Sequence, residues 1–346
     1  MDIGSVTLTR RHRSARSDPP VPSCDESGAP VFALRRFVVL AVLAPCVLAA
    51  ALAVTLASAG PPPAPSSGHP TVDPERPVRM LPTISRFRPS PIGAARSIKP
   101  MEYHGGPVMT GPIKVYVIWY GNWSRKTRRR AIITDFLNNL AGPRFAINMT
   151  YPDASGATVA NSLTLAGQHF DRYSAGRTSV TDAKIGRIVA SAIRLAKLPS
   201  DPNGIYLVLT SNDVGKPGFL TQYCGWHSFR RIGAHSIKYA FVGDPTGPNL
   251  LVCGAQKVSP NADAGADAMV SVIAHEIDEA VTDPELNAWY DSTGAENADR
   301  CSWSYGPTFP VGRAKANVRL GTRNFLIQRN WLNTARGGCV LEVPPA

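Results

Sequence analysis

The sequence predicts an α/β fold: a single domain in which a mixed sheet is covered by helices. Two observations carry this prediction. Apolar runs of strand length alternate with segments whose apolar residues recur every three to four positions, as on one face of a helix. The alternation begins near Met101, after a hydrophobic segment and a proline-rich stretch. We therefore assign residues 101–346 to one folded unit.

The first half of this unit is expected to alternate strands with helices. The run "IKVYVIWYG" at 113–121 is an apolar strand, followed by a helix over 125–142 that ends at a glycine. The stretch 157–167 has strand character and leads to a helix over 182–198. A further apolar strand is predicted at 204–212.

The second half is expected to begin with a loop that carries Cys224, followed by a strand at 239–243 and a loop with Cys253. A helix that includes residues 266–281 comes next. Apolar residues occupy most of its circumference, so it is predicted to be buried on more than one side. Two short closing strands are predicted after it, within 324–333 and 339–343.

The first hundred residues predict export. Residues 1–36 are polar and basic, and 37–59 form an apolar run of membrane-insertion type, with a small-residue cleavage pattern that ends at Ala59. A cleaved signal peptide is one interpretation, and an uncleaved type II anchor, the chain's only contact with a membrane, is the other. Either places the remaining chain outside the cytosol. Residues 60–100 contain eleven prolines and are interpreted as a linker.

Cysteine usage and two glycosylation sequons agree with export. Four cysteines in an exported domain predict two disulfides, and neighbour order pairs Cys224 with Cys253 and Cys301 with Cys339. The sequons begin at Asn122 and Asn148 and predict glycans there.

The net charge of +12 indicates which kinds of partner the protein is expected to bind. Residues 1–59 carry six basic and four acidic residues, so +10 remains on the exported part. A basic exported protein is expected to associate with anionic surfaces such as acidic cell-wall polysaccharide. The basic run at 124–130 is interpreted as a solvated first helical turn rather than a binding patch. No nucleic-acid-binding module is recognisable, and export excludes nucleic acid as the expected partner.

The helix at 266–281 carries the candidate site, in the sequence "HEIDE". His275 and Glu279 are one helical turn apart, so their side chains can meet a common partner. Glu276 stands where H-E-x-x-H enzymes carry the carboxylate that takes a proton from metal-bound water, and it is the candidate catalytic residue. Glu279 replaces the second histidine of that motif. The helix is thus metalloprotease-like, with an H-E-x-x-E sequence.

Further ligands are expected from the acid-rich loop that follows. Glu296 or Asp299 would complete three protein ligands and leave one position for water. We expect one divalent metal, zinc first, with manganese or calcium as alternatives because several carboxylates make the set rich in oxygen. In the structural alternative, His275 and Glu279 bond to each other and the loop acids are solvated.

Two other places compete as sites. The stretch 259–269 has the spacing of a calcium loop, although capping of the following helix by Asp263 explains it equally well. His227, in the sequence "CGWH", is either a further ligand or a loop residue, and we favour the loop.

Four stretches together resemble the EXORDIUM, or phosphate-induced protein 1, family of plant and microbial secreted proteins. They are "YHGGPVMTGPIKVYVIWYGNW", "GIYLVLTSNDV", "CGWH" and "SPNADAGADAMV". The resemblance implies an extracellular or cell-wall setting and, in plants, a role in promoting growth. It attaches no established enzymatic activity. It also implies an acid-bearing microbial branch, in which "HEIDEAVTDP" is followed by "ENADRC".

Two functions are therefore expected as alternatives. In the first, a secreted protein of EXORDIUM type binds a metal and uses Glu276 to hydrolyse an extracellular peptide or protein substrate. In the second, the protein is a non-enzymatic wall or signalling protein whose site is structural or vestigial, and its basic surface holds it on acidic polysaccharide.

Overall fold

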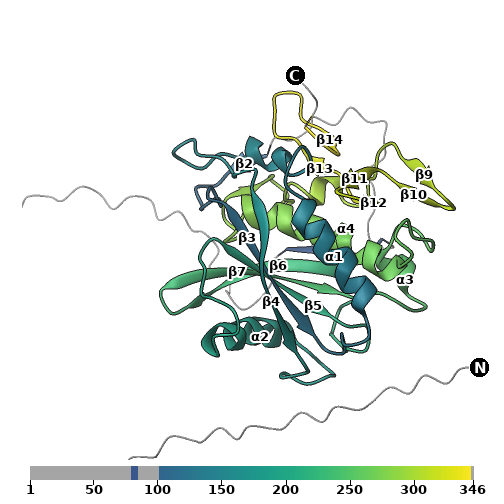
Figure 1. Cartoon of the computed structure of the whole chain (residues 1–346). Coiled ribbons are helices and arrows are strands. Elements are labelled where there is room, and N and C mark those ends of the chain that lie inside the picture. Colours follow the sequence, from purple (N-terminus) through teal and green to yellow (C-terminus); the bar gives the residue numbers. More distant parts are fainter. Residues whose placement is uncertain (1–78, 85–100, 344–346) are drawn as a thin grey trace, which may run out of the picture. The chain divides into compact units, whose positions relative to one another are not determined.

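The computed structural model describes residues 79–84 and 101–343, and its largest element is a six-stranded mixed sheet (Figure 1). The strand order is β1-β6-β7-β5-β3-β4. The bounds are Arg79–Pro82 for β1, Ile113–Tyr120 for β3, Leu163–Asp171 for β4, Gly204–Thr210 for β5, Tyr223–Ile232 for β6 and His235–Gly243 for β7. Strands β4, β3, β5 and β7 are parallel, and β6 is antiparallel to both its neighbours. The predicted mixed sheet is confirmed.

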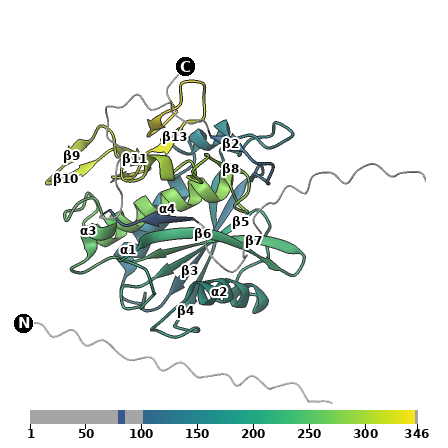
Figure 2. The same cartoon turned by 180° about the vertical axis from the view of Figure 1, so that it is seen from behind.

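Helices cover both faces of the sheet (Figures 1 and 2). They are α1 (Thr127–Asn139), α2 (Asp182–Arg194), α3 (Leu250–Cys253) and α4 (Ala264–Thr282), with short 3-10 turns η1 (Phe145–Thr150) and η2 (Asp299–Cys301). One hydrophobic cluster joins α1 and α4 to one face, and a second joins α2 to the other. These helices hide the apolar side chains of a sheet that is buried on both faces.

The other described strands, most of them C-terminal, do not join this sheet. They pair in small two-stranded units: β2 (Glu102–Tyr103) with β8 (Trp289–Tyr290), β9 (Phe309–Val311) with β10 (Ala314–Ala316), β11 (Val318–Leu320) with β12 (Arg323–Phe325), and β13 (Asn330–Trp331) with β14 (Cys339–Val340). The yellow C-terminal segments lie on the side of α4 away from the sheet (Figure 1). Helix α4 is therefore enclosed on both sides, and every residue from Gly265 to Thr282 is buried.

Two predictions about segments are wrong. The segment with Cys224 and His227 is strand β6 rather than a loop, because β1 and β7 supply backbone partners on both its sides. Residues 79–82 are a strand at the edge of the sheet rather than part of a linker, and Leu81 is fully buried. The remaining predicted linker and the predicted signal segment 37–59 lie outside the described residues.

Both predicted disulfides are confirmed. Cys224–Cys253 connects β6 to α3, and Cys301–Cys339 connects η2 to β14. Within the described part of the chain, no helix is both long enough and apolar enough to cross a membrane.

The basic run at 124–130 is only partly solvated. Arg129 donates to the carboxylates of Asp244 and Asp263, and Lys126 lies 2.9 Å from Asp244. Asp263 also caps α4, since its side chain accepts from the backbone N–H of Ala266 at 3.0 Å. The predicted capping role of Asp263 is thus confirmed.

The two sequons differ in exposure. Asn122 is exposed, whereas Asn148 is fully buried and its amide nitrogen donates to Asp278 at 2.8 Å. A glycan on this nitrogen is incompatible with the fold, so the prediction for Asn148 is wrong.

Expression through a glycosylating secretory pathway is therefore expected to yield a glycan at Asn122 and none at Asn148, because only Asn122 is accessible. Peptide mass mapping of the folded protein would check this, with Asn122→Gln as the control. A glycan found on Asn148 of folded protein would contradict the structure.

Candidate metal centre

Helix α4, strand β6 and the loop from 291 to 301 meet at one buried place. α4 contributes three neighbouring polar side chains from its C-terminal half: His275, Glu276 and Glu279 are at most 1% exposed. The helix is held there because its apolar residues face the sheet on one side and the C-terminal segments on the other. Polar groups on the same helix are thereby forced into the interior.

The first group of possible ligands joins α4 to the loop. His275 Nε2 lies 2.9 Å from Glu279 Oε1 and 3.5 Å from Asp299 Oδ1. The contact with Glu279 lacks hydrogen-bond geometry, since neither ring nitrogen of His275 has a hydrogen-bond partner. The backbone N–H of Asp299 donates to the same Glu279 oxygen at 3.0 Å. The loop is thus fixed against the helix by its backbone.

The second group includes a residue that sequence reasoning placed in a loop. His227, fully buried on β6, has Nε2 at 3.1 Å from Glu296 Oε2 and 3.8 Å from Glu279 Oε2. Interpreting His227 as a loop residue was wrong. One sequence signal could have indicated its role. His227 is two residues after Gly225, and alternate residues of a strand share one face, so in a strand His227 would lie on the face where the glycine admits a close neighbour.

Gly225 of β6 is in close contact with α4. A Cβ atom at this position would lie 2.5 Å from Val272 Cγ1 and 2.6 Å from Glu276 Oε1, too close for any side chain. The glycine therefore lets Glu276 approach the backbone of β6, on the strand face that Gly225 shares with His227.

Glu276 is the most unusual carboxylate of the centre. It is fully buried, and neither carboxylate oxygen has a hydrogen-bond partner. Burial, and then the negative charge of Glu279, raise the pKa of Glu276 well above its usual value. Such a group either holds a proton or needs a nearby cation.

The histidine on α4 responds in the opposite way. Burial alone would lower the pKa of His275, but the neighbouring carboxylates of Glu279, Asp299 and Glu276 raise it well above its ordinary value. The surroundings of His275 thus favour a positive charge at this place.

These residues fit a divalent metal ion. In each group of three, one nitrogen and two carboxylate oxygens lie within 4.8 Å of one another. Imidazole and carboxylate together suit zinc or manganese, and carboxylate oxygens also suit calcium. The structure brings all four predicted ligands together (His275, Glu279, Glu296 and Asp299) and adds His227. Metal binding itself stays a prediction.

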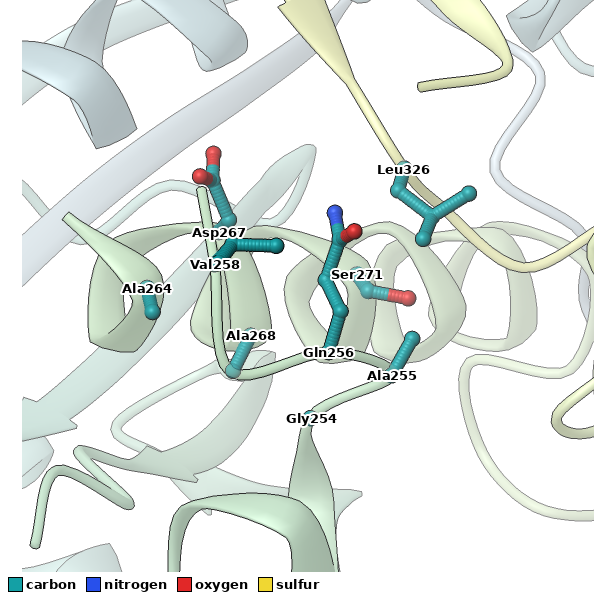
Figure 3. Close-up of a pocket in the computed structure, with 9 residues that line it drawn as sticks. All are labelled: Gly254, Ala255, Gln256, Val258, Ala264, Asp267, Ala268, Ser271 and Leu326. Carbon is teal, nitrogen blue, oxygen red and sulfur yellow. The ribbon is translucent and has the colours of Figure 1, made fainter. Parts of the chain in front are cut away.

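The site is enclosed. Among the five possible ligands, only the Asp299 side chain has appreciable exposure, at 18%. A separate pocket lies nearer the start of α4, where its lining includes Asp267, Ser271, Gln256 and Leu326 (Figure 3). No predicted ligand lines that pocket, so it is not the metal centre.

Comparison with known proteins identifies the family. The conserved region of phosphate-induced protein 1 matches residues 101–317. The chain is 34% identical over 303 residues to Protein EXORDIUM-like 5 of Arabidopsis thaliana, covering 75% of this chain and 82% of the relative. It is 28% identical over 237 residues to Protein PHOSPHATE-INDUCED 1 of Nicotiana tabacum, covering 59% of this chain and 72% of the relative. No solved structure matches. The chain belongs to the phosphate-induced protein 1, or EXORDIUM, family.

Proposed function

We propose that this protein is an extracellular metalloprotein of the EXORDIUM family, in which a buried divalent metal ion ties α4 to β6 and to the acidic loop. Zinc is the first choice, with manganese or calcium as alternatives. The signal-like segment before residue 60 and the two disulfides support export.

One observation carries the proposal: two buried histidines and three carboxylates converge from three segments that are far apart in the sequence. Ionised carboxylates are almost never buried without a partner, because desolvating each one costs several kcal/mol. A divalent ion offsets this cost, and His275 Nε2 and Glu279 Oε1, which lie 2.9 Å apart, would both bind it. Two ligands of one ion approach each other in this way.

The test is metal content, measured by mass spectrometry on the full-length protein. We expect bound zinc or manganese in the wild type and its loss in the double variant His275→Ala, Glu279→Ala, because Glu279 belongs to both ligand groups. His235→Ala is the matched control, since His235 lies on β7 and bonds to Ser200. Wild-type protein without metal after attempted loading would refute the proposal.

A second function, metal-dependent hydrolysis of an extracellular peptide or protein, is favoured by Glu276. Its carboxylate adjoins the proposed ligands and lacks a hydrogen-bond partner, so it is placed as a general base would be. The enclosed ligands favour the structural function over this one.

Glu276→Gln separates the two functions. If the protein is a hydrolase, the variant is expected to keep its metal but lose roughly 10²- to 10⁴-fold in hydrolysis, because the amide cannot accept the proton. Peptide-library digestion with metal-loaded protein would measure this. Equal activity in wild type and variant would exclude Glu276 as the base.

Acidic polysaccharide is the proposed partner of the exported surface. The exported part carries +10, and Arg125 and Arg128 are exposed at the start of α1. This association needs neither the metal nor Glu276.

A further inference from the structure

The two carboxylate oxygens of Glu279 face different histidines. Oε1 lies 2.9 Å from His275 Nε2, whereas Oε2 lies 3.8 Å from His227 Nε2. Glu279 therefore stands between α4's own histidine and the histidine of β6. This is the position of a carboxylate that bridges two ions.

The remaining ligands divide in the same way. Asp299 accompanies His275 on one side of Glu279, and Glu296 accompanies His227 on the other, 3.1 Å from its Nε2. Among the described residues, the ligand atoms gather into two groups of three that share Glu279, rather than into one group of five. Each group offers one imidazole nitrogen and two carboxylate oxygens from different residues.

The charges also favour two ions. Glu276, Glu279, Glu296 and Asp299 carry four negative charges when ionised, and three of them are at most 1% exposed. Two divalent ions would balance the charge of four ionised carboxylates, whereas one ion would balance two of them.

We propose that the centre holds a pair of divalent metal ions bridged by Glu279, one at His275 and Asp299 and the other at His227 and Glu296. Two-metal sites with ions about 3.5–4 Å apart are known in hydrolytic enzymes. The proposal rests on the proposed function, because it requires that the centre binds metal. The ion at Asp299 faces the partly exposed ligand and is the one expected to exchange first.

Metal stoichiometry tests this proposal on the full-length protein loaded with manganese or zinc. Two metal ions per chain are expected in the wild type. One ion per chain is expected in His227→Ala and one in His275→Ala, because each variant disrupts one of the two ligand groups. His235→Ala should keep two. Electron paramagnetic resonance of manganese-loaded wild type should show an exchange-coupled pair, a readout that depends on no variant.

The outcomes separate the two proposals. One equivalent in the wild type, with an uncoupled manganese signal, would overturn the ion pair and leave a single metal site. No bound metal would overturn the proposed function as well.

Discussion

A chelator strong enough to remove bound metal is expected to lower the melting temperature by roughly 8–16 °C. At a free metal concentration a thousand times Kd, binding contributes about 4 kcal/mol to the folded state. In domains of this size, each kcal/mol shifts the melting temperature by about 2–4 °C. The effect is large because removal of the metal leaves the charges of Glu279 and Glu296, both at most 1% exposed, with protein partners alone to offset them.

The pH dependence of this effect has a defined sign. Without metal, the pKa of His275 is higher in the folded than in the unfolded protein. Protonated His275 therefore stabilises the fold fully below the unfolded pKa of about 6.5, and this contribution is lost as pH rises through the pKa of the folded state. The pKa of Glu276 is raised as well. The folded state then binds more protons than the unfolded state, and stability again falls with rising pH.

The stability of the metal-bound protein is expected to rise with pH instead. Protons compete with the metal for the ligands, so the loss of protons at higher pH strengthens metal binding. The gap between the melting temperatures of metal-loaded and chelated protein should therefore widen between about pH 6 and pH 8, as pH rises past the unfolded pKa of histidine. Thermal unfolding followed by circular dichroism measures both curves.

The double variant His275→Ala, Glu279→Ala serves as the control, and its melting temperature should not respond to the chelator. A wild-type melting temperature that ignores the chelator throughout this pH range would contradict a stabilising metal.

The sequence predicts α4 and its polar residues well because the information is local. Apolar residues at helical spacing identify a helix with more than one buried side, and the row of His275 and Glu279 follows from the same period. Glu296 and Asp299 could be suspected because acids concentrate in the loop after the helix. Their convergence on α4 depends on the backbone bond from Asp299 to Glu279, which no local pattern encodes.

Strand β6 is one of the elements that the sequence did not predict, and it matters most for the site. Its residues from Tyr223 to Ser228 are all buried, so the alternation that marks a half-buried strand is missing, and Gly225 lowers strand propensity further. The glycine is needed because α4 packs directly against it. His227 was therefore interpreted as a loop residue, although it completes the second ligand group.

The two disulfides adjoin the centre from different sides, and their contributions to it should differ. Cys224 lies on β6 near His227, but hydrogen bonds to β1 and β7 already fix that strand. Cys301 is two residues after Asp299, in a loop outside the sheet whose bonds to α4 are those of Asp299 to Glu279 and of Asn297 to Asp278. Only the second disulfide therefore positions a ligand that the sheet does not hold.

Replacing Cys301 and Cys339 with serine is expected to destabilise the fold by about 3–4 kcal/mol, from the unfolded-state entropy of a closed loop of this length, and to raise the Kd for metal. Losing the support of a ligand typically weakens metal binding about 10- to 100-fold.

The matched pair Cys224→Ser, Cys253→Ser should lose similar stability with little change in Kd, because β6 stays in the sheet. Competition with a chromophoric chelator, on variants checked to be folded, measures both. Equal Kd values for the two pairs of variants would show that neither disulfide matters more than the other for metal binding. This result would contradict the role proposed for Cys301–Cys339 in positioning Asp299.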